Sequence, residues 1–273
     1  MDVIFIVFLG VLVGLVMGLT GAGGGILAVP LLVIGLGLPV IEAAPVAMLA
    51  VGISAAVGAL LGLKDNIVRY RATLLIALCG IIMAPLGVWI AYRLDTRLMS
   101  LLFAGVLVWV AYRTFYEIYR QRQNLAAELE SAPPCIRNDY SGRFIWTNSC
   151  ALALSLSGAI AGALSGLLGV GGGFIIVPAL QRYTDLDMQS VVATSLAVIF
   201  VVSFVTVAAS FSAGHLDFRL AMPFTAGSII GMSGASFLKP RMPQRHLKIT
   251  FGIMCIVIAA AMICITFYSK ISK

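Results

Sequence analysis

Two glycine clusters constrain this chain more than any other feature of its sequence. Residues 21–25 read GAGGG and residues 169–173 read GVGGG, and each cluster is followed by four apolar residues and a proline, Pro30 or Pro178. Glycine in a helix costs about 1 kcal/mol relative to alanine, so the clusters predict two breaks inside long apolar segments. A broken backbone at membrane depth is tolerated only where protein buries it or where it lines a cavity. A matched pair of such breaks therefore predicts a binding site.

The composition places the chain in a membrane. Of its 273 residues, 61% are hydrophobic and 11% are charged, and the mean hydropathy is +1.06, whereas soluble domains carry about 25% charged residues. The apolar residues form long blocks and not the alternation of a transmembrane β-barrel. We therefore predict an all-α polytopic protein of the plasma or inner membrane, with the lipid bilayer as a partner. Because the basic residues lie mostly in loops, the net charge of +7 indicates topology and not nucleic-acid binding.

Blocks of spanning length follow each cluster. About 20 helical residues cross the hydrocarbon. The blocks lie at residues 41–63, 72–92, 98–116, 188–213, 220–238 and 249–268. The pieces directly after the clusters, at 26–38 and 174–180, are shorter. Each half is thus predicted to hold one helix broken at its glycine motif and about three full spans.

One offset of 148 residues relates the two halves. It pairs Gly21 with Gly169, Gly14 with Gly162, Gly18 with Gly166, Pro30 with Pro178, Arg71 with Arg219 and Arg93 with Arg241. Such agreement predicts an internal duplication, which is common in transporters. The predicted domains are a first transmembrane repeat at 1–116, a polar linker at 117–145 and a second transmembrane repeat at 146–273.

The distribution of Lys and Arg predicts that the repeats are inverted. If the pieces flanking each cluster form a hairpin, the linker and the basic turns at 64–71 and 239–248 fall on one side of the membrane. If residues 3–38 instead cross the membrane once, the repeats are parallel and the excess of Lys and Arg on one side becomes smaller. The positive-inside rule favours the inverted arrangement, with the linker in the cytoplasm and both termini outside.

The clusters predict an anion site. A helix that begins inside the membrane presents unpaired N–H groups, and its dipole favours negative charge there. Glycine lets two such backbones approach one ligand, and nearby hydroxyls add hydrogen bonds. The predicted substrate-binding residues are Thr20, Gly21, Gly23, Gly24, Gly25, Gly169, Gly171, Gly172, Gly173, Thr194 and Ser195. The alternatives are that the glycines serve helix packing alone and that the hydroxyls bond their own helices.

No cofactor, metal site or catalytic group is predicted. The five cysteines show no metal-binding spacing, and neither a catalytic dyad nor a deep carboxylate indicates an enzyme. The G-x-G pattern lacks the βαβ context of a dinucleotide site. Because no ATP-binding motif occurs, pumping would draw on an ion gradient, which makes a coupling proton or cation a candidate partner. The sequence does not specify an oligomeric state.

The doubled motif, the stretch at 192–196 (VATSL) and the two halves joined by a polar linker resemble the TauE/SafE sulfite exporter family, also called TSUP. The resemblance covers nearly the whole chain. It implies a secondary transporter of sulfite, organosulfonates or related small sulfur-containing anions, bound between the two glycine breaks. In the first repeat, Val46 and Ala47 stand at the positions of Thr194 and Ser195, so we expect an asymmetric site. A carrier or channel for another small solute and a non-transporting membrane scaffold remain alternatives.

Overall fold

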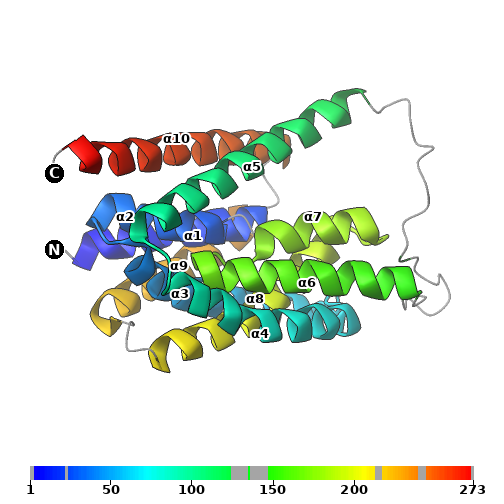
Figure 1. Ribbon diagram of the computed structural model, residues 1–273. Coiled ribbons are helices and arrows are strands. Elements are labelled where there is room, and N and C mark those ends of the chain that lie inside the picture. The colour runs from blue at the N-terminus through cyan, green and yellow to red at the C-terminus, as the bar shows by residue number, and fades with distance from the viewer. Residues whose placement is uncertain are drawn as a thin grey trace.

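The computed structural model is helical over nearly all of its described part (Figure 1). It describes residues 3–21, 24–123, 135, 147–212, 217–238 and 244–271. Within these ranges the helices are α1 (Val3–Thr20), α2 (Gly24–Leu36), α3 (Val40–Lys64), α4 (Tyr70–Ala91), α5 (Thr96–Gln123), α6 (Asn148–Leu168), α7 (Gly173–Tyr183), α8 (Met188–Ser212), α9 (Phe218–Leu238) and α10 (Gln244–Ile271). The prediction of an all-α chain is confirmed.

Six of these helices are long and apolar enough to cross a membrane. They are α1, α3, α4, α5, α6 and α8, judged by length and composition. Helix α2 and the segment Ile249–Ile265 of α10 are shorter apolar pieces. Since a crossing needs about 20 residues, the described part of the chain has the make-up of a multi-pass membrane protein, as predicted.

The helix boundaries recur at the predicted offset. Helices α3 and α8 begin 148 residues apart and end 148 residues apart, and so do α5 and α10. Figure 1 shows α1 and α6 starting at opposite ends of the molecule, with the N- and C-terminal ends on the same side. This arrangement agrees with inverted repeats, while their common origin stays a prediction. The predicted linker begins inside a helix, because α5 continues past residue 116 to Gln123.

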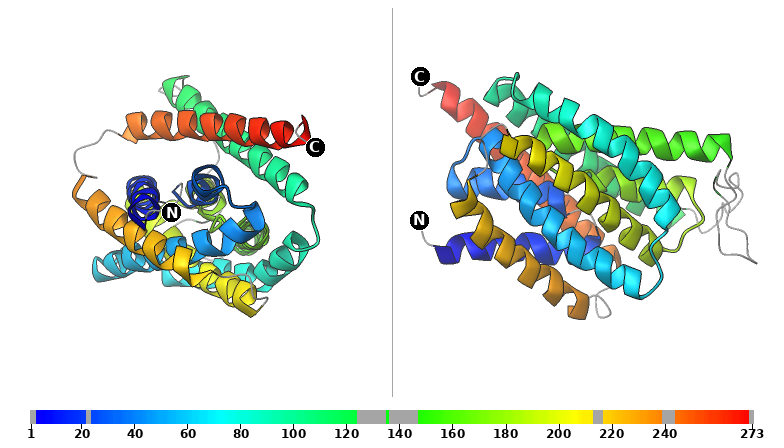
Figure 2. Two further views of the ribbon diagram at one scale, coloured as in Figure 1. Left: turned by 90° about the vertical axis from the view of Figure 1, so that its left-hand side faces the viewer. Right: turned by 90° about the horizontal axis from the view of Figure 1, so that it is seen from below.

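The two halves pack crosswise. Helix α1 packs along α9, and α6 packs along α4, while α3 packs on α8 and α5 on α10. Figure 2 shows α5 and α10 crossing on one side of the bundle formed by the other helices. The central helices α3 and α8 thus each belong to a different half of the sequence and share one interface.

Glycines line both crosswise seams. A Cβ added at Gly14 on α1 would run into the carbonyl of Ser228 on α9, and one added at Gly162 on α6 would run into the carbonyl of Gly80 on α4. The same close approach to backbone or side chains of the facing helix occurs at Gly10, Gly18, Gly158 and Gly166. Small residues that let helix backbones approach are the usual device for packing in lipid. The packing interpretation of these helix glycines agrees with the contacts.

Replacement of Gly14 by alanine is expected to destabilise the protein by about 1–3 kcal/mol, the range for overpacking a tight interface. The added methyl group would push α1 away from α9. The matched control is Gly105→Ala on α5, where a Cβ meets nothing within 4 Å. That variant is expected to be neutral or to gain up to about 1 kcal/mol of helix propensity. Thermal unfolding of the two purified variants measures the difference in stability. Equal melting temperatures would contradict the close packing of α1 on α9 at Gly14.

A disulfide joins the linker to α6. Cys135 and Cys150 are bonded, with their Cα atoms 5.1 Å apart, and both are buried. The backbone of Cys135 also pairs with the end of α7: its N–H donates to the carbonyl of Tyr183 at 3.0 Å, and its carbonyl accepts from the N–H of Asp185 at 3.3 Å. Residue spacing gave no sign of this pair. It bears on topology, because disulfides are rare in the cytoplasm, where the charge distribution places the linker.

The charge distribution leads us to expect that Cys135 cannot be labelled from outside intact cells. A variant that lacks Cys79, Cys255 and Cys264 isolates the pair. Intact cells are treated with an impermeant phosphine reductant and then with an impermeant maleimide, and permeabilised cells receive the same treatment. Labelling only after permeabilisation supports a cytoplasmic linker. Labelling of intact cells after reduction would place the linker on the oxidising side and overturn the orientation inferred from charge.

Candidate functional site

The two helix breaks lie in the buried interior of the molecule. Helix α1 ends at Thr20 and α2 begins at Gly24, whereas α6 ends at Leu168 and α7 begins at Gly173. All described residues of both glycine clusters are buried; Gly23, one of the predicted site residues, lies outside the described ranges. Backbone that leaves the helix at membrane depth is tolerated where protein buries it, and both breaks meet this condition.

The backbone conformation at the breaks demands glycine. The φ angle is 82° at Gly21, 71° at Gly169, 77° at Gly171 and 67° at Gly172. Residues with a Cβ rarely adopt such positive angles, and glycine adopts them without penalty. Helix packing alone gives no reason for four left-handed glycines at two breaks.

The two breaks touch each other. A Cβ added at Gly25 would lie 2.6 Å from the carbonyl oxygen of Val170, so the start of α2 rests directly on the second break. Each break is also covered by a central helix of the other half: Gly21 packs on Val192 of α8 and Gly169 on Ala44 of α3. Val192 follows Ala44 by 148 residues, so the two covers are equivalent. The structure thus brings the two predicted glycine clusters together.

The predicted hydroxyls are already engaged in hydrogen bonds. Thr20 donates to the carbonyl of Val16 at 2.8 Å, and Ser195 donates to the carbonyl of Val192 at 2.8 Å. The hydroxyl of Thr194 accepts from the backbone N–H of Arg69 at 3.2 Å. Thr20 and Ser195 thus follow the local alternative, whereas Thr194 ties α8 to the start of α4.

Thr194→Val is expected to lower the stability of the protein by about 0.5–1.5 kcal/mol, the net value of one hydrogen bond. Valine keeps the shape of threonine but cannot accept from the N–H of Arg69. The matched variant Ser195→Ala should change stability little, because its hydroxyl donates to a carbonyl of its own helix and alanine favours the helix. Melting temperatures of both variants test this; a larger loss in Ser195→Ala would contradict these assignments.

The contact between the turn before α4 and Thr194 could not be predicted from the sequence. Arg69 directly precedes α4 and is half-buried, and its backbone contacts Thr194. Arg69 belongs to a turn between two spans, and folding brings the backbone of this turn against α8.

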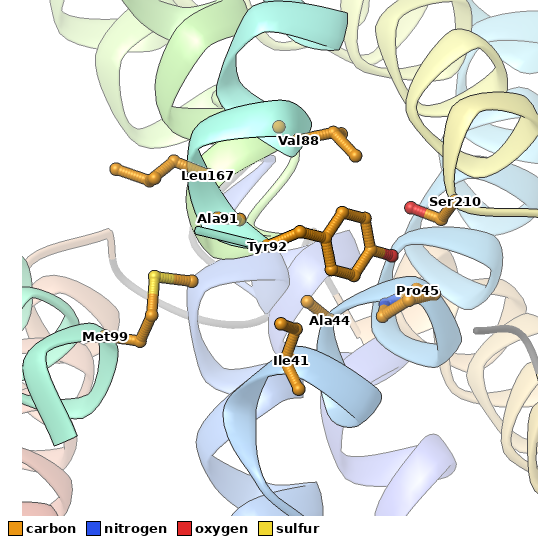
Figure 3. Close-up of a pocket in the computed structure, with 10 residues that line it drawn as sticks. Ile41, Ala44, Pro45, Val88, Ala91, Tyr92, Met99, Leu167 and Ser210 are labelled. Atoms are coloured by element: carbon orange, nitrogen blue, oxygen red, sulfur yellow. The ribbon is translucent and has the colours of Figure 1, made fainter. Parts of the chain in front are cut away.

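A small pocket lies beside the second break (Figure 3). Its volume is about 20 Å³, which holds one water molecule and no larger ligand. The last turn of α6, through Gly166 and Leu167, and Ala44 of α3 line it. In Figure 3 the Tyr92 ring points into the pocket toward Ser210 from the opposite wall. Neither Tyr92 nor Ser210 could be assigned from the sequence, because they come together only through the packing of α4 against α8.

Hydroxyl groups concentrate on α8. Its buried hydroxyl residues are Ser190, Thr194, Ser195, Ser203, Thr206 and Ser210. The positions 148 residues earlier, all of them on α3, are Glu42, Val46, Ala47, Ala55, Gly58 and Gly62. The asymmetry expected from two positions therefore extends along the whole helix.

Asp187 fixes the start of α8. Its carboxylate accepts from the N–H of Ser190 at 3.2 Å, as an N-cap residue does. Partial burial raises the pKa of Asp187, but the hydrogen bonds from Ser190 outweigh it, so the pKa lies below its ordinary value of 3.8. The cap is therefore charged at neutral pH, and it holds the helix that carries the hydroxyls.

A pair of buried, touching helix breaks within a bundle of apolar spans is typical of a multi-pass membrane transporter. The chain belongs to the family described as "Sulfite exporter TauE/SafE", whose model matches residues 6–262. The resemblance inferred from the doubled motif is thereby confirmed. Because the family is one of membrane transporters, it also agrees with the expectation of a non-enzyme.

Two relatives illustrate the similarity. A "Probable membrane transporter protein" of Xylella fastidiosa (strain 9a5c) is 31% identical over 254 residues, which cover 92% of this chain and 90% of that protein. A "Probable membrane transporter protein YunE" of Bacillus subtilis (strain 168) is 22% identical over 270 residues, which cover 96% and 98%. No solved structure matches the chain significantly.

Proposed function

We propose that this membrane transporter is a secondary carrier that moves a small sulfur-containing anion, such as sulfite or an organosulfonate, across the cell membrane. The observation that carries the proposal is the contact between the two glycine breaks, at Gly25 and Val170. Through this contact the N-termini of α2 and α7 lie close to one another. The family is named after the export of sulfite, which supports the choice of anion.

The charge of the proposed site favours a monoanion. The N-terminus of a helix carries roughly half a positive charge, and α2 and α7 both begin at the breaks. Two such ends balance about one negative charge, so a dianion needs an accompanying proton or cation. Monoanionic sulfonates should therefore bind more tightly than sulfate.

Equivalent positions of the two halves are packed differently at the two ends of the molecule. This difference in packing supports a transport route. Pro45 and Ser210 line the small pocket near the second break. Their counterparts at the offset of 148 are Ala193 and Gly62. There the packing is tight, since a Cβ added at Gly62 would lie 2.7 Å from that of Ala193. In the proposed carrier, the end with Pro45 and Ser210 is closed by looser packing, and the end with Gly62 and Ala193 is closed by tighter packing.

The binding of anions is expected to stabilise the purified protein. A ligand at 100 times its dissociation constant adds about 2.7 kcal/mol to the unfolding free energy. Sulfite, methanesulfonate, sulfate and acetate are compared by thermal unfolding, with an amine as the control for a cation carrier. Stabilisation by sulfite and methanesulfonate above sulfate supports the proposal. Stabilisation by the amine alone would favour the carrier of another solute.

Gly172→Ala is expected to abolish anion binding and transport while the protein still inserts into the membrane. Its φ of 67° strains any side chain, and the added Cβ would lie 2.7 Å from the carbonyl oxygen of Ala161, so the second break must move. Gly37→Ala is the matched control, because Gly37 has a φ of 68° but open space around its Cβ position. It should keep transport. If both variants transport equally, the break is not the site.

A further inference from the structure

An apolar cavity opens between α3 and α8, separate from the small pocket of Figure 3. Its volume is about 310 Å³, which is in the size range of small-molecule sites. Its walls are almost wholly hydrocarbon, and the aromatic residues among them are Phe200, Phe204, Phe211 and Phe218. Phe204 is 71% exposed and Phe211 59% exposed, so the cavity opens to the side of the bundle, where a membrane protein meets lipid.

The inner end of the cavity holds an unpartnered hydroxyl. Ser203 lines the cavity and is 1% exposed, and its oxygen has no hydrogen-bond partner within the described part of the chain. Buried hydroxyls are normally hydrogen-bonded, so an exception needs an explanation. The oxygen lies 4.0 Å from where a Cβ on Gly171 would be. The apolar cavity therefore ends in a polar group beside the second glycine break, close to the start of α7.

We propose that the cavity binds the hydrocarbon tail of the transported anion, whose sulfonate head group accepts a hydrogen bond from Ser203 at the second break. This inference rests on the proposed function and narrows it to an organosulfonate with an alkyl or aryl group. Apolar walls and one placed polar group form the usual pattern of a small-molecule site. The hydroxyl decides against a lipid acyl chain as the occupant. A chain entering from the bilayer would bring its methyl end to Ser203, where nothing could accept its hydrogen bond.

The crossing of α3 and α8 leaves room for the Ser203 side chain. A Cβ added at Gly52 on α3 would lie 2.8 Å from the Cβ of Ser203, so a glycine at this crossing makes room for the serine. Ala55 stands at the position 148 residues before Ser203. The hydroxyl at the end of the cavity therefore comes from the second half of the chain. A bound amphiphile is expected to place its head group at this hydroxyl and its tail toward the lipid.

The test is a chain-length series. Binding of methane-, butane- and hexanesulfonate to the full-length protein in phosphatidylcholine nanodiscs is measured by calorimetry, with empty nanodiscs as the partition control. Each buried CH₂ should tighten binding about fourfold (about 0.8 kcal/mol at 1.36 kcal/mol per factor of ten). Ala208, an exposed residue at the cavity, is replaced in Ala208→Trp to fill the space. Ala260→Trp, at an exposed alanine of α10, is the matched control.

The expected pattern separates the tail from the head group. Ala208→Trp should abolish the gain with chain length and leave methanesulfonate binding unchanged, while Ala260→Trp keeps the wild-type series. Ser203→Ala should weaken every sulfonate by at least about tenfold, the lower end for a hydrogen bond to a charged group, without changing the gain per CH₂.

Equal affinities for methane- and hexanesulfonate in the wild-type protein would overturn the tail site and leave the proposed function standing. A chain-length gain that survives Ala208→Trp would also overturn it. A protein that binds neither sulfite nor methanesulfonate would overturn the proposed function itself.

Discussion

The hydrogen bonding of the backbone in hydrocarbon is the constraint on which this structure depends. A helix that stops inside the bilayer leaves N–H and C=O groups that lipid cannot satisfy, so the breaks after α1 and α6 can exist only under a cover of protein. Ala44 of α3 and Val192 of α8 supply that cover, each over the break of the other half. Gly25 at the start of α2 also lies directly against Val170 of the second break. The burial of α3 and α8 at the centre follows from this requirement.

The same requirement makes the two halves inseparable. Helix α1 finds its partner in α9 and α6 finds its partner in α4, and both pairs approach closely through glycines such as Gly14 and Gly162. Neither half holds both members of a seam. The boundaries drawn in the sequence at 116 and 146 therefore mark where the pattern repeats and not where a unit could fold alone. A secondary carrier of this kind would work by moving helices of one half against those of the other.

Much of the fold could be predicted because the apolar blocks and the glycines act locally. The bounds of α3 and α8 agree with the predicted spans at 41–63 and 188–213 within one residue. Helix α5 runs further than its apolar block, to Gln123, and an ion pair at 3.5 Å between Arg113 and Glu117, one turn apart, stabilises the helix at the end of that block. The disulfide of Cys135, the position of Arg69 and the unpartnered Ser203 could not be predicted. Each of these features depends on contacts between segments that are distant in the sequence, and no local sequence pattern predicts such contacts.

The contrast between a repeated framework and a one-sided set of hydroxyls has a physical reason in a carrier. Both access states must be populated, so their free energies can differ by only a few kcal/mol. Two equivalent breaks and two equivalent seams meet this condition, because the packing lost on one side is regained on the other. The ligand, however, must be held in one orientation. In the proposed carrier, the hydroxyls concentrated on α8 can orient the anion. Because a hydrogen bond contributes about 0.5–1.5 kcal/mol, each of them changes the balance between the two states only slightly.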